Sequence, residues 1–208
     1  MELLEELKNS IISQNQKRVK ELTEELIKSG MDINIIINAI TEALKIVGDR
    51  FNNGDLFLPE VIRAANASKA ALNLILPKML ERKTDDYKGT IAIGSLGPHD
   101  IGKTIVSAAL IANGFRVIDM GVNITPEVVE KTLRENEVHI LALSILLTSD
   151  IEKARIIIER AKKLTNGLRV MVGGAVMNES IASNIKADAY GKNADEAVEI
   201  ANKLIRGK

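Results

Sequence analysis

Apolar residues in the first eighty or so positions recur at the three- and four-residue spacing of amphipathic helices. Gly30 is expected to follow the end of one helix, and Asp32 to cap the next. Residues 52–55 have the composition of a turn, and Pro59 suits the first turn of a further helix. Four helices with short connections are therefore predicted, and an antiparallel four-helix bundle would bury their apolar faces. The residues expected to face inward are Leu3, Leu4, Leu7, Ile11, Ile12, Val19, Leu22, Leu26, Ile27, Ile33, Ile36, Ile37, Ile40, Leu44, Val47, Phe51, Val61, Ile62, Ala65, Ser68, Leu72, Ile75, Leu76 and Met79.

The pattern changes after Gly89, where short apolar runs alternate with helical stretches. This alternation predicts a parallel sheet with helices on both faces, and five strands fit a flavodoxin-like doubly wound domain. We therefore predict a helical domain over 1–83, a polar linker over 84–89 and an α/β domain over 90–208. The predicted strands are Thr90–Ile93, Phe115–Asp119, Ile140–Leu143, Arg169–Val172 and Ala187–Tyr190, and the predicted helices are Ile101–Asn113, Pro126–Arg134, Asp150–Leu164, Glu179–Ile185 and Asp195–Ile205.

A glycine-rich turn over 94–103 links the first of these strands to its helix and carries His99, one of only two histidines. Open α/β sheets bind their ligands at the carboxyl ends of the strands, where this turn lies. His99 is either a metal ligand or an exposed or helix-capping residue of the loop. No second histidine, cysteine or carboxylate has a recognisable metal-site spacing, so a metal held by His99 would take most of its other ligands from a cofactor.

The other loops at this edge carry hydroxyls and glycines that permit two interpretations. Ser144 and Thr148 either bind a ligand or end a strand and cap the next helix. Gly173 and Gly174 either let a ligand approach the backbone or form a tight turn. His139 opens a strand at the opposite edge, so we assign it a structural role. Phe57 and Leu58, with the fourth helix, are expected in the bundle core or at a domain contact.

Composition excludes several classes of function. Equal numbers of basic and acidic residues, 28 of each, and only 2% aromatic residues argue against nucleic acid or an anionic membrane as partner. The absence of cysteine excludes disulfides and thiolate sites. No signal peptide or membrane-length apolar run is present, so a soluble, cytoplasmic protein is expected.

A dinucleotide site is the main rival interpretation of the glycine-rich turn. Asp119 ends the second strand, near where a ribose-binding acid would lie. However, the segment 97–102 lacks the middle glycine of the fingerprint and places Pro98 and His99 where backbone amides should meet pyrophosphate. The P-loop pattern fits less well still. Asp119 is better explained as a loop or helix-capping acid.

Four segments, in order over the whole chain, give a resemblance to the corrinoid (vitamin B12, cobalamin) proteins of methyltransferase systems and to the B12-binding module of methionine synthase. Residues 54–60 (GDLFLPE) resemble a segment of the family's helical cap domain. Residues 99–103 (HDIGK) are similar to the core of its Asp-x-His-x-x-Gly motif. Residues 143–148 (LSILLT) and 170–175 (VMVGGA) resemble its Ser-x-Leu loop and its Gly-Gly motif.

The resemblance implies a Rossmann-like B12-binding domain after a four-helix cap domain, with cobalamin or a related corrinoid as cofactor. It implies that His99 is the lower axial cobalt ligand and that the bundle covers the upper corrin face. It also implies methyltransferase proteins as partners, with a homodimer left open, for a cytoplasmic protein that carries a methyl group on cobalt from one methyltransferase to another. Such a carrier turns over little alone, so its status as an enzyme stays open. The cofactor-binding residues implied are His99, Asp100, Ile101, Gly102, Ser144, Leu146, Thr148, Gly173 and Gly174.

The turn departs from the family motif, because Gly97 stands where the family has an aspartate two residues before the histidine. Such a carboxylate accepts the ligand's other N–H, and its loss typically costs roughly 10–100-fold in metal affinity or activity. Water or a carbonyl would then replace it, or the corrinoid would bind without the histidine. A non-catalytic corrinoid-responsive sensor, or a degenerate B12-binding module, is therefore the alternative function, and a nucleotide-binding enzyme is a third.

Overall fold

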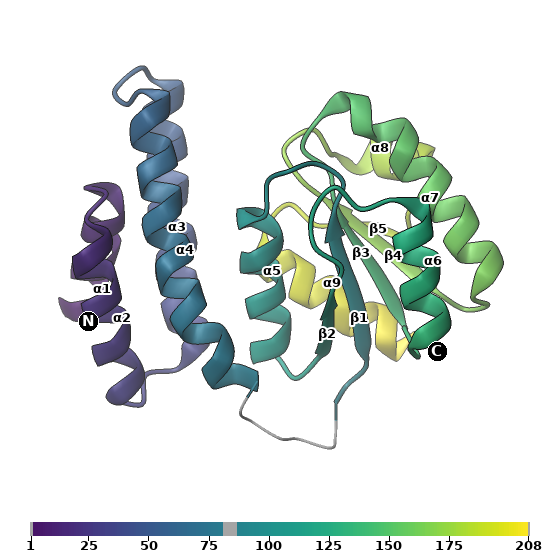
Figure 1. Cartoon of the computed structure of the whole chain (residues 1–208), viewed down its shortest axis with the longest axis horizontal. Helices are drawn as coiled ribbons and strands as arrows, with labels where there is room; N and C mark the ends of the chain where they lie inside the picture. The colour runs from purple at the N-terminus through teal and green to yellow at the C-terminus, as the bar shows by residue number, and fades with distance from the viewer. Residues whose placement is uncertain (1, 81–86, 208) are drawn as a thin grey trace. The chain divides into compact units, whose positions relative to one another are not determined.

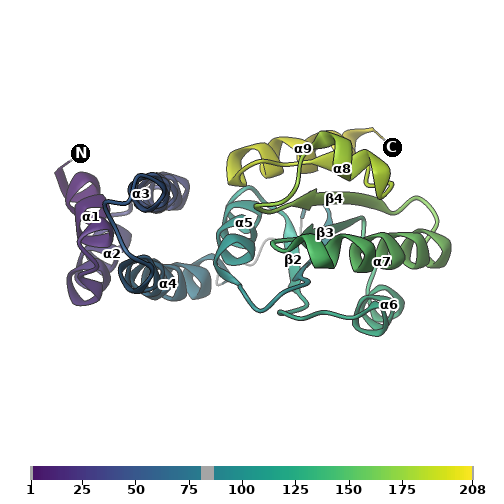
Figure 2. The same cartoon turned by 90° about the horizontal axis from the view of Figure 1, so that it is seen from above.

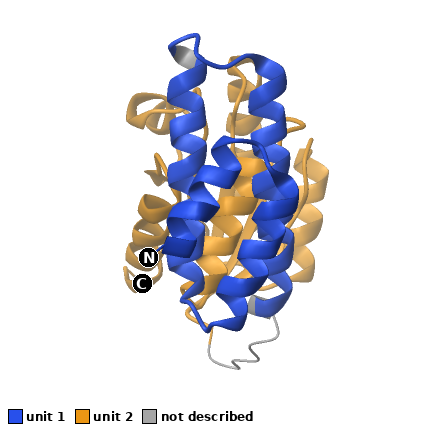
Figure 3. Cartoon of the chain, turned by 90° about the vertical axis from the view of Figure 1, so that its left-hand side faces the viewer, with its two compact units in different colours: residues 1–83 blue, residues 84–208 orange. Residues whose placement is uncertain are grey.

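The computed structural model of the protein describes residues 2–80 and 87–207 (Figure 1). The chain forms two compact units, Met1–Lys83 and Thr84–Lys208, which are coloured separately in Figure 3. Residues 84–86 of the predicted linker lie outside the described residues. None of the described helices has the length and hydropathy needed to cross a membrane.

The first unit contains the four predicted helices, α1 (Glu2–Ile12), α2 (Gln16–Lys28), α3 (Ile33–Asn52) and α4 (Leu58–Leu80). Helix α1 packs mainly against α3, and α2 mainly against α4. Their apolar stripes supply the buried core of this unit, as the helical spacing of apolar residues predicts. Its largest fully buried side chains are Leu7, Ile11, Leu22, Leu26, Ile36, Ile37, Ile40, Leu72 and Ile75.

The ends of these helices follow the predicted local chemistry. Asp32 is the N-cap of α3, and its side chain accepts a hydrogen bond from the backbone N–H of Asn34 at 2.9 Å. Gly30 follows α2 with φ of +75°, a left-handed conformation that glycine adopts without a Cβ penalty. Pro59 lies in the first turn of α4. The helix boundaries in this half of the chain are therefore encoded locally.

Some residues expected in the bundle core are exposed instead. Ile62 is 51% exposed and Phe51 is 43% exposed, so their predicted inward orientation is wrong. Phe57, at 72%, and Leu58, at 59%, are also outside the core. Helix α4 instead buries the small side chains of Ala64, Ala67, Ala70 and Ala71. Small residues let helix backbones approach closely, and Ile62 lies outside the buried face of this helix, whereas Leu72 and Ile75 lie on it.

The second unit has a five-stranded parallel sheet with strand order β2-β1-β3-β4-β5. This is the flavodoxin-like order, so the predicted fold is confirmed. Three strands extend past their predicted ends, to Ser95, Ser144 and Gly173, whereas the second begins one residue later and the last is shorter than predicted. The strands are β1 (Thr90–Ser95), β2 (Arg116–Asp119), β3 (Ile140–Ser144), β4 (Arg169–Gly173) and β5 (Ala189–Tyr190).

Helices cover both faces of this sheet, as Figure 2 shows from above. One apolar cluster joins the sheet to α5 and α9 and contains Ile91, Ile93, Leu110 and Phe115. The other joins the opposite face to α6, α7 and α8, with Ala92 from β1. Alternate strand residues therefore face opposite layers. The helices are α5 (Ile101–Ala112), α6 (Pro126–Glu135), α7 (Ile151–Leu164), α8 (Glu179–Asn184) and α9 (Ala194–Arg206), and a 3₁₀ turn, η1 (Thr148–Asp150), precedes α7.

Candidate functional site

Three residues at the carboxyl ends of neighbouring strands lie at one level across the sheet. The parallel register pairs Ser95 of β1 with Ser144 of β3, and Ser144 with Gly173 of β4. Ser95 lies two positions after Ile93 on the face that α5 and α9 cover, so paired Ser144 shares that face. This row of two hydroxyls and a glycine forms the floor of the candidate site.

Backbone hydrogen bonds hold the surrounding loops together. The Leu96 N–H donates to the Ser144 carbonyl at 3.1 Å, and the Ile145 N–H donates to the Gly173 carbonyl at 2.8 Å. The Asn123 N–H donates to the Gly97 carbonyl at 3.1 Å. These bonds tie the loops that follow β1, β2 and β3, together with the end of β4, into one rim, which is the arrangement expected of a ligand site at this edge of a parallel sheet.

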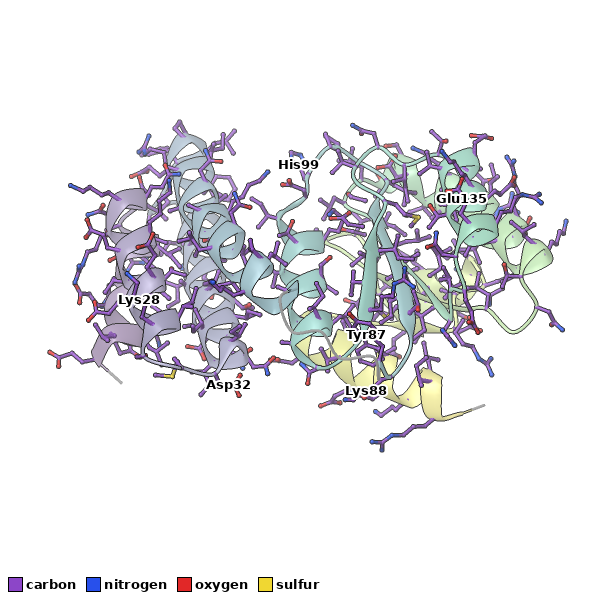
Figure 4. The ribbon with its side chains drawn as sticks, turned by 60° about the horizontal axis from the view of Figure 1, so that its bottom comes forward. Lys28, Asp32, Tyr87, Lys88, His99 and Glu135 are labelled. Carbon is purple, nitrogen blue, oxygen red and sulfur yellow. The ribbon has the colours of Figure 1, made fainter. Side chains whose placement is uncertain are left out.

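His99 lies on the loop between β1 and α5, and Figure 4 labels its side chain. The side chain is exposed, and it makes no hydrogen bond or ion pair with any part of the chain that the structure describes. Asp100 is the N-cap of α5 but makes no capping bond through its side chain, and Ile101 and Gly102 form the first turn. The imidazole therefore has no hydrogen-bond or ion-pair partner among the described residues, so its ring nitrogens are available to bind a metal.

Gly173 and Gly174 are required by close backbone packing. A Cβ on Gly173 would lie 2.8 Å from the carbonyl oxygen of Gly191. A Cβ on Gly174 would lie 2.1 Å from the carbonyl oxygen of Ile145, and Gly174 has φ of +122°. The structure therefore gives these glycines a packing role of their own, whether or not a ligand passes them.

The remaining predicted residues lie on the loop after β3. Leu146 is partly buried, whereas Thr148 is exposed and begins the 3₁₀ turn η1. The backbone brings this loop to the same rim as Ser144 and Gly173. Every predicted site residue thus comes from a loop, a strand end or the first turn of α5 at this one edge.

Two buried polar atoms at this edge, Ser95 Oγ and Asp150 Oδ2, have no hydrogen-bond partner among the described residues. Buried polar groups are nearly always hydrogen-bonded, so unpartnered ones call for an explanation such as a ligand. Sequence reasoning missed both. The parallel register would have found Ser95 beside Ser144, but Asp150 was interpreted only as the start of a helix.

Lys103, the last residue of the HDIGK segment, is a buried residue that forms an ion pair. Its side chain is only 4% exposed and its ammonium forms an ion pair with Asp119, whose side chain is 51% exposed. The other Asp119 oxygen accepts the backbone N–H of Gly121 at 2.8 Å. Asp119 is therefore a loop acid, and the pair fixes α5 to the end of β2.

We expect Asp119→Asn to cost more stability than Lys103→Met. The first variant leaves a buried ammonium without its anion and should lower the free energy of unfolding by about 1–3 kcal/mol. The second leaves a half-exposed carboxylate that water solvates, so its cost should be within about 1 kcal/mol. Urea unfolding monitored by circular dichroism measures both. Equal costs would contradict the assignment of Lys103 as the buried partner.

His139, the second histidine, has a structural role. Its Nδ1 accepts a hydrogen bond from the backbone N–H of Thr90 at 3.2 Å, near the amino ends of β1 and β3. It lies at the edge opposite to His99. No group of three or more His, Cys, Asp or Glu side chains in the described residues is arranged to hold a metal ion.

The comparisons with known proteins show the family of this chain. A B12 binding domain family matches residues 91–199, more than half of the chain, and a second family with the same description matches residues 3–76. The chain belongs to the B12-binding corrinoid proteins. A corrinoid protein of Desulfitobacterium hafniense is 33% identical over 99% of this chain and 98% of its own.

Solved structures support the same assignment. The monomethylamine corrinoid protein of Methanosarcina barkeri matches with a TM-score of 0.82 and 30% identity, over 98% of each chain. A chain of the methanol:cobalamin methyltransferase complex from the same organism matches with a TM-score of 0.57 and 26% identity, over 100% of this chain and 81% of that chain. The predicted family and the two-part fold are thus confirmed, and cobalamin or a related corrinoid is the cofactor.

The residues at the carboxyl edge fit this cofactor. A corrinoid would bring a metal that a protein nitrogen could hold and a polar tail that hydrogen-bonding groups could hold. His99 offers an uncommitted imidazole, and Ser95 Oγ is a buried hydroxyl without a partner among the described residues.

Proposed function

We propose that this protein carries a methyl group on a bound corrinoid between a substrate-specific methyltransferase and a second methyltransferase. The observation that carries the proposal is the uncommitted His99 imidazole at the carboxyl edge of a B12-binding sheet. The relatives are named as corrinoid proteins of methylamine systems, and one matched chain belongs to a methyltransferase complex. These relatives favour a carrier over the sensor that the Gly97 departure suggested.

In this proposal each residue of the edge has a role toward the cofactor. His99 would hold the cofactor metal through one ring nitrogen, and Asp100, Ile101 and Gly102 would set the turn that presents it. Ser144, Leu146 and Thr148 contact the cofactor's tail, with Ser95 as a further hydroxyl. Gly173 and Gly174 keep the backbone close beside it. Residues 1–83 act as the cap domain and residues 90–208 as the cofactor-binding domain.

The protein's contribution is ligation, orientation and exclusion of water. When bound, the corrinoid cobalt supplies an atom that accepts a methyl group from one partner and releases it to the next. The His99 ring donates an electron pair through one nitrogen, and its other nitrogen retains a proton that needs an acceptor. We propose a methyltransferase protein as partner and a cytoplasmic location; homodimer formation stays a prediction.

Reconstitution with cobalamin tests the role of His99. The wild-type protein should retain cobalamin through gel filtration and show the visible spectrum of a nitrogen-ligated corrinoid. His99→Ala should retain less cobalamin and show the spectrum of a corrinoid without a lower nitrogen ligand, because no other imidazole lies at this edge. The matched control is His139→Gln, which keeps an acceptor for the Thr90 N–H and should give the wild-type spectrum.

Two outcomes would count against the proposal. Failure of the wild-type protein to retain cobalamin would overturn the corrinoid function altogether. Identical spectra for wild-type and His99→Ala would remove the ligand role of His99 while leaving corrinoid binding in place. Methyl transfer from the methylated, loaded protein to a partner methyltransferase, measured with an isotopically labelled methyl group, would separate a carrier from a sensor.

A further inference from the structure

A metal-binding histidine almost always donates its second ring N–H to a carboxylate, a carbonyl or a water. The residue two positions before His99 is Gly97, which has no side chain to serve as that acceptor. The question is therefore whether another element of the fold brings a carboxylate to the same place.

Asp150 is that carboxylate. A Cβ built on Gly97 would lie 3.5 Å from Asp150 Oδ2, and no other described atom lies within 4 Å of that Cβ apart from the chain neighbours of Gly97. An aspartate at position 97 would carry its carboxyl group directly on this Cβ. Asp150, at the end of the 3₁₀ turn η1, thus places an oxygen in the region that such a side chain would occupy.

The Asp150 carboxylate has no other structural role in the described part of the chain. Its Oδ2 is buried and has no hydrogen-bond partner there. Asp150 is the N-cap of α7, yet its side chain makes no capping hydrogen bond. A buried oxygen without a partner is costly, which indicates that the site is completed by a donor.

The nearby cations are engaged elsewhere. Lys153, one turn along α7, directs its ammonium to the carbonyl oxygen of Leu96 at 3.4 Å. Lys103 pairs with Asp119. The amino end of α7 supplies no capping hydrogen bond to the Asp150 side chain. Asp150 Oδ2 is therefore an acceptor without a donor among the described residues, and it lies beside the loop that carries His99.

We propose that Asp150 is the positioning residue of His99, an inference that rests on the proposed corrinoid function. Its carboxylate accepts the N–H of the ring nitrogen that does not bind cobalt. This contact fixes the tautomer and the orientation of the imidazole and raises its basicity. The chain thereby replaces a carboxylate on the loop after β1 with one delivered by the loop after β3.

Asp150→Asn tests the proposal at a single pH with cobalamin as the probe. We expect roughly 10–100-fold weaker cobalamin binding and a smaller fraction of nitrogen-ligated cofactor in the visible spectrum. The melting temperature without cofactor should change little, because the carboxylate has no partner among the described residues that it would lose. A merely structural role predicts the reverse: a lower melting temperature with an unchanged spectrum.

Glu152→Gln is the matched control, since it also converts a carboxylate to an amide, in the first turn of the helix that Asp150 caps. The pKa of the Glu152 carboxyl is held below its usual range by the hydrogen bond from Arg155, so the variant also removes one negative charge at neutral pH. Its side chain is exposed and already paired with Arg155. The spectrum of the loaded Glu152→Gln protein should therefore match the wild type.

Gly97→Asp provides the rescue. A Cβ at position 97 would make only an ordinary van der Waals contact, with Asp150 Oδ2 at 3.5 Å, and Gly97 has no left-handed φ, so a side chain is sterically allowed there. In the Asp150→Asn background it should restore affinity and spectrum toward the wild type. In the wild-type background it places two carboxylates side by side and should bring no gain. In a His99→Ala background, Asp150→Asn should have no further effect, because its action passes through the ring.

The outcomes separate this inference from the proposed function. If the wild-type protein is nitrogen-ligated through His99 and Asp150→Asn has the same affinity and spectrum, the inference fails and the proposed function stands. The inference also fails if Asp150→Asn weakens binding as much in the His99→Ala background as in the wild type. If the wild-type protein retains no cobalamin, the proposed function fails and the inference falls with it.

Discussion

Gly174→Ala is expected to destabilise the α/β unit by about 2–6 kcal/mol and to abolish corrinoid retention. Its φ of +122° disfavours any L side chain, and strain of this kind costs about 1–3 kcal/mol. The new Cβ would also lie 2.1 Å from the carbonyl oxygen of Ile145 and 2.8 Å from its nitrogen. Overpacking adds about 1–3 kcal/mol, and backbone atoms cannot move aside as a flexible side chain would.

Urea unfolding of the Gly174→Ala protein and its retention of cobalamin through gel filtration measure these effects. Gly167→Ala is the matched control, with φ of +79° and nothing within 4 Å of its Cβ. This control carries the backbone penalty alone, about 1–2 kcal/mol, and lies at the other end of β4. Equal losses for the two variants would show that the close approach of Ile145 contributes nothing.

Phe115→Ala is expected to lower the free energy of unfolding by about 3–5 kcal/mol. Phe115 is fully buried in the cluster between the sheet and helices α5 and α9. The Lys88 ammonium lies 5.6 Å from the centroid of its ring, a position in which the charge adds a favourable cation–π contact. Truncation to alanine removes this contact and leaves a cavity that the surrounding strands cannot fill.

Phe57→Ala removes the same side chain from the surface of the bundle, where Phe57 is 72% exposed. Its cost should stay within about 0.5 kcal/mol, as for other surface substitutions. Thermal or urea unfolding of both variants measures the difference. A small effect at Phe115, or a large one at Phe57, would contradict the assignment of core and surface.

These variants bear on function because the candidate site has little structure of its own. Its residues lie on loops and at the ends of strands and of one helix, and backbone hydrogen bonds such as Leu96 N–H to Ser144 C=O hold them in place. The sheet below sets the level of Ser95, Ser144 and Gly173 through its parallel register. Substitutions that loosen the sheet or its glycine turns should therefore impair cofactor retention, even far from His99.

Short sequence motifs predicted part of the site but not all of it. His99, Ser144, Gly173 and Gly174 were chosen from local sequence, and the structure brings all four to the carboxyl edge of the sheet; their contacts with the cofactor stay a prediction. Asp150 was not chosen, since nothing in its neighbourhood along the chain relates it to Gly97. The two loops are more than fifty residues apart in the sequence.

The sequence by itself determined the two-part layout, because the periods of 3.6 and 2 are local properties of side-chain direction along helices and strands. It also determined the helix ends at Gly30 and Asp32, which depend on backbone conformation and capping within a few residues. The tertiary structure alone decided that Ile62 and Phe51 are exposed, because burial depends on which face of each helix its neighbours cover, as the buried alanines of α4 show. The tertiary structure alone also decided that Asp150 lies beside Gly97, because that contact depends on how two strands align and where their loops turn.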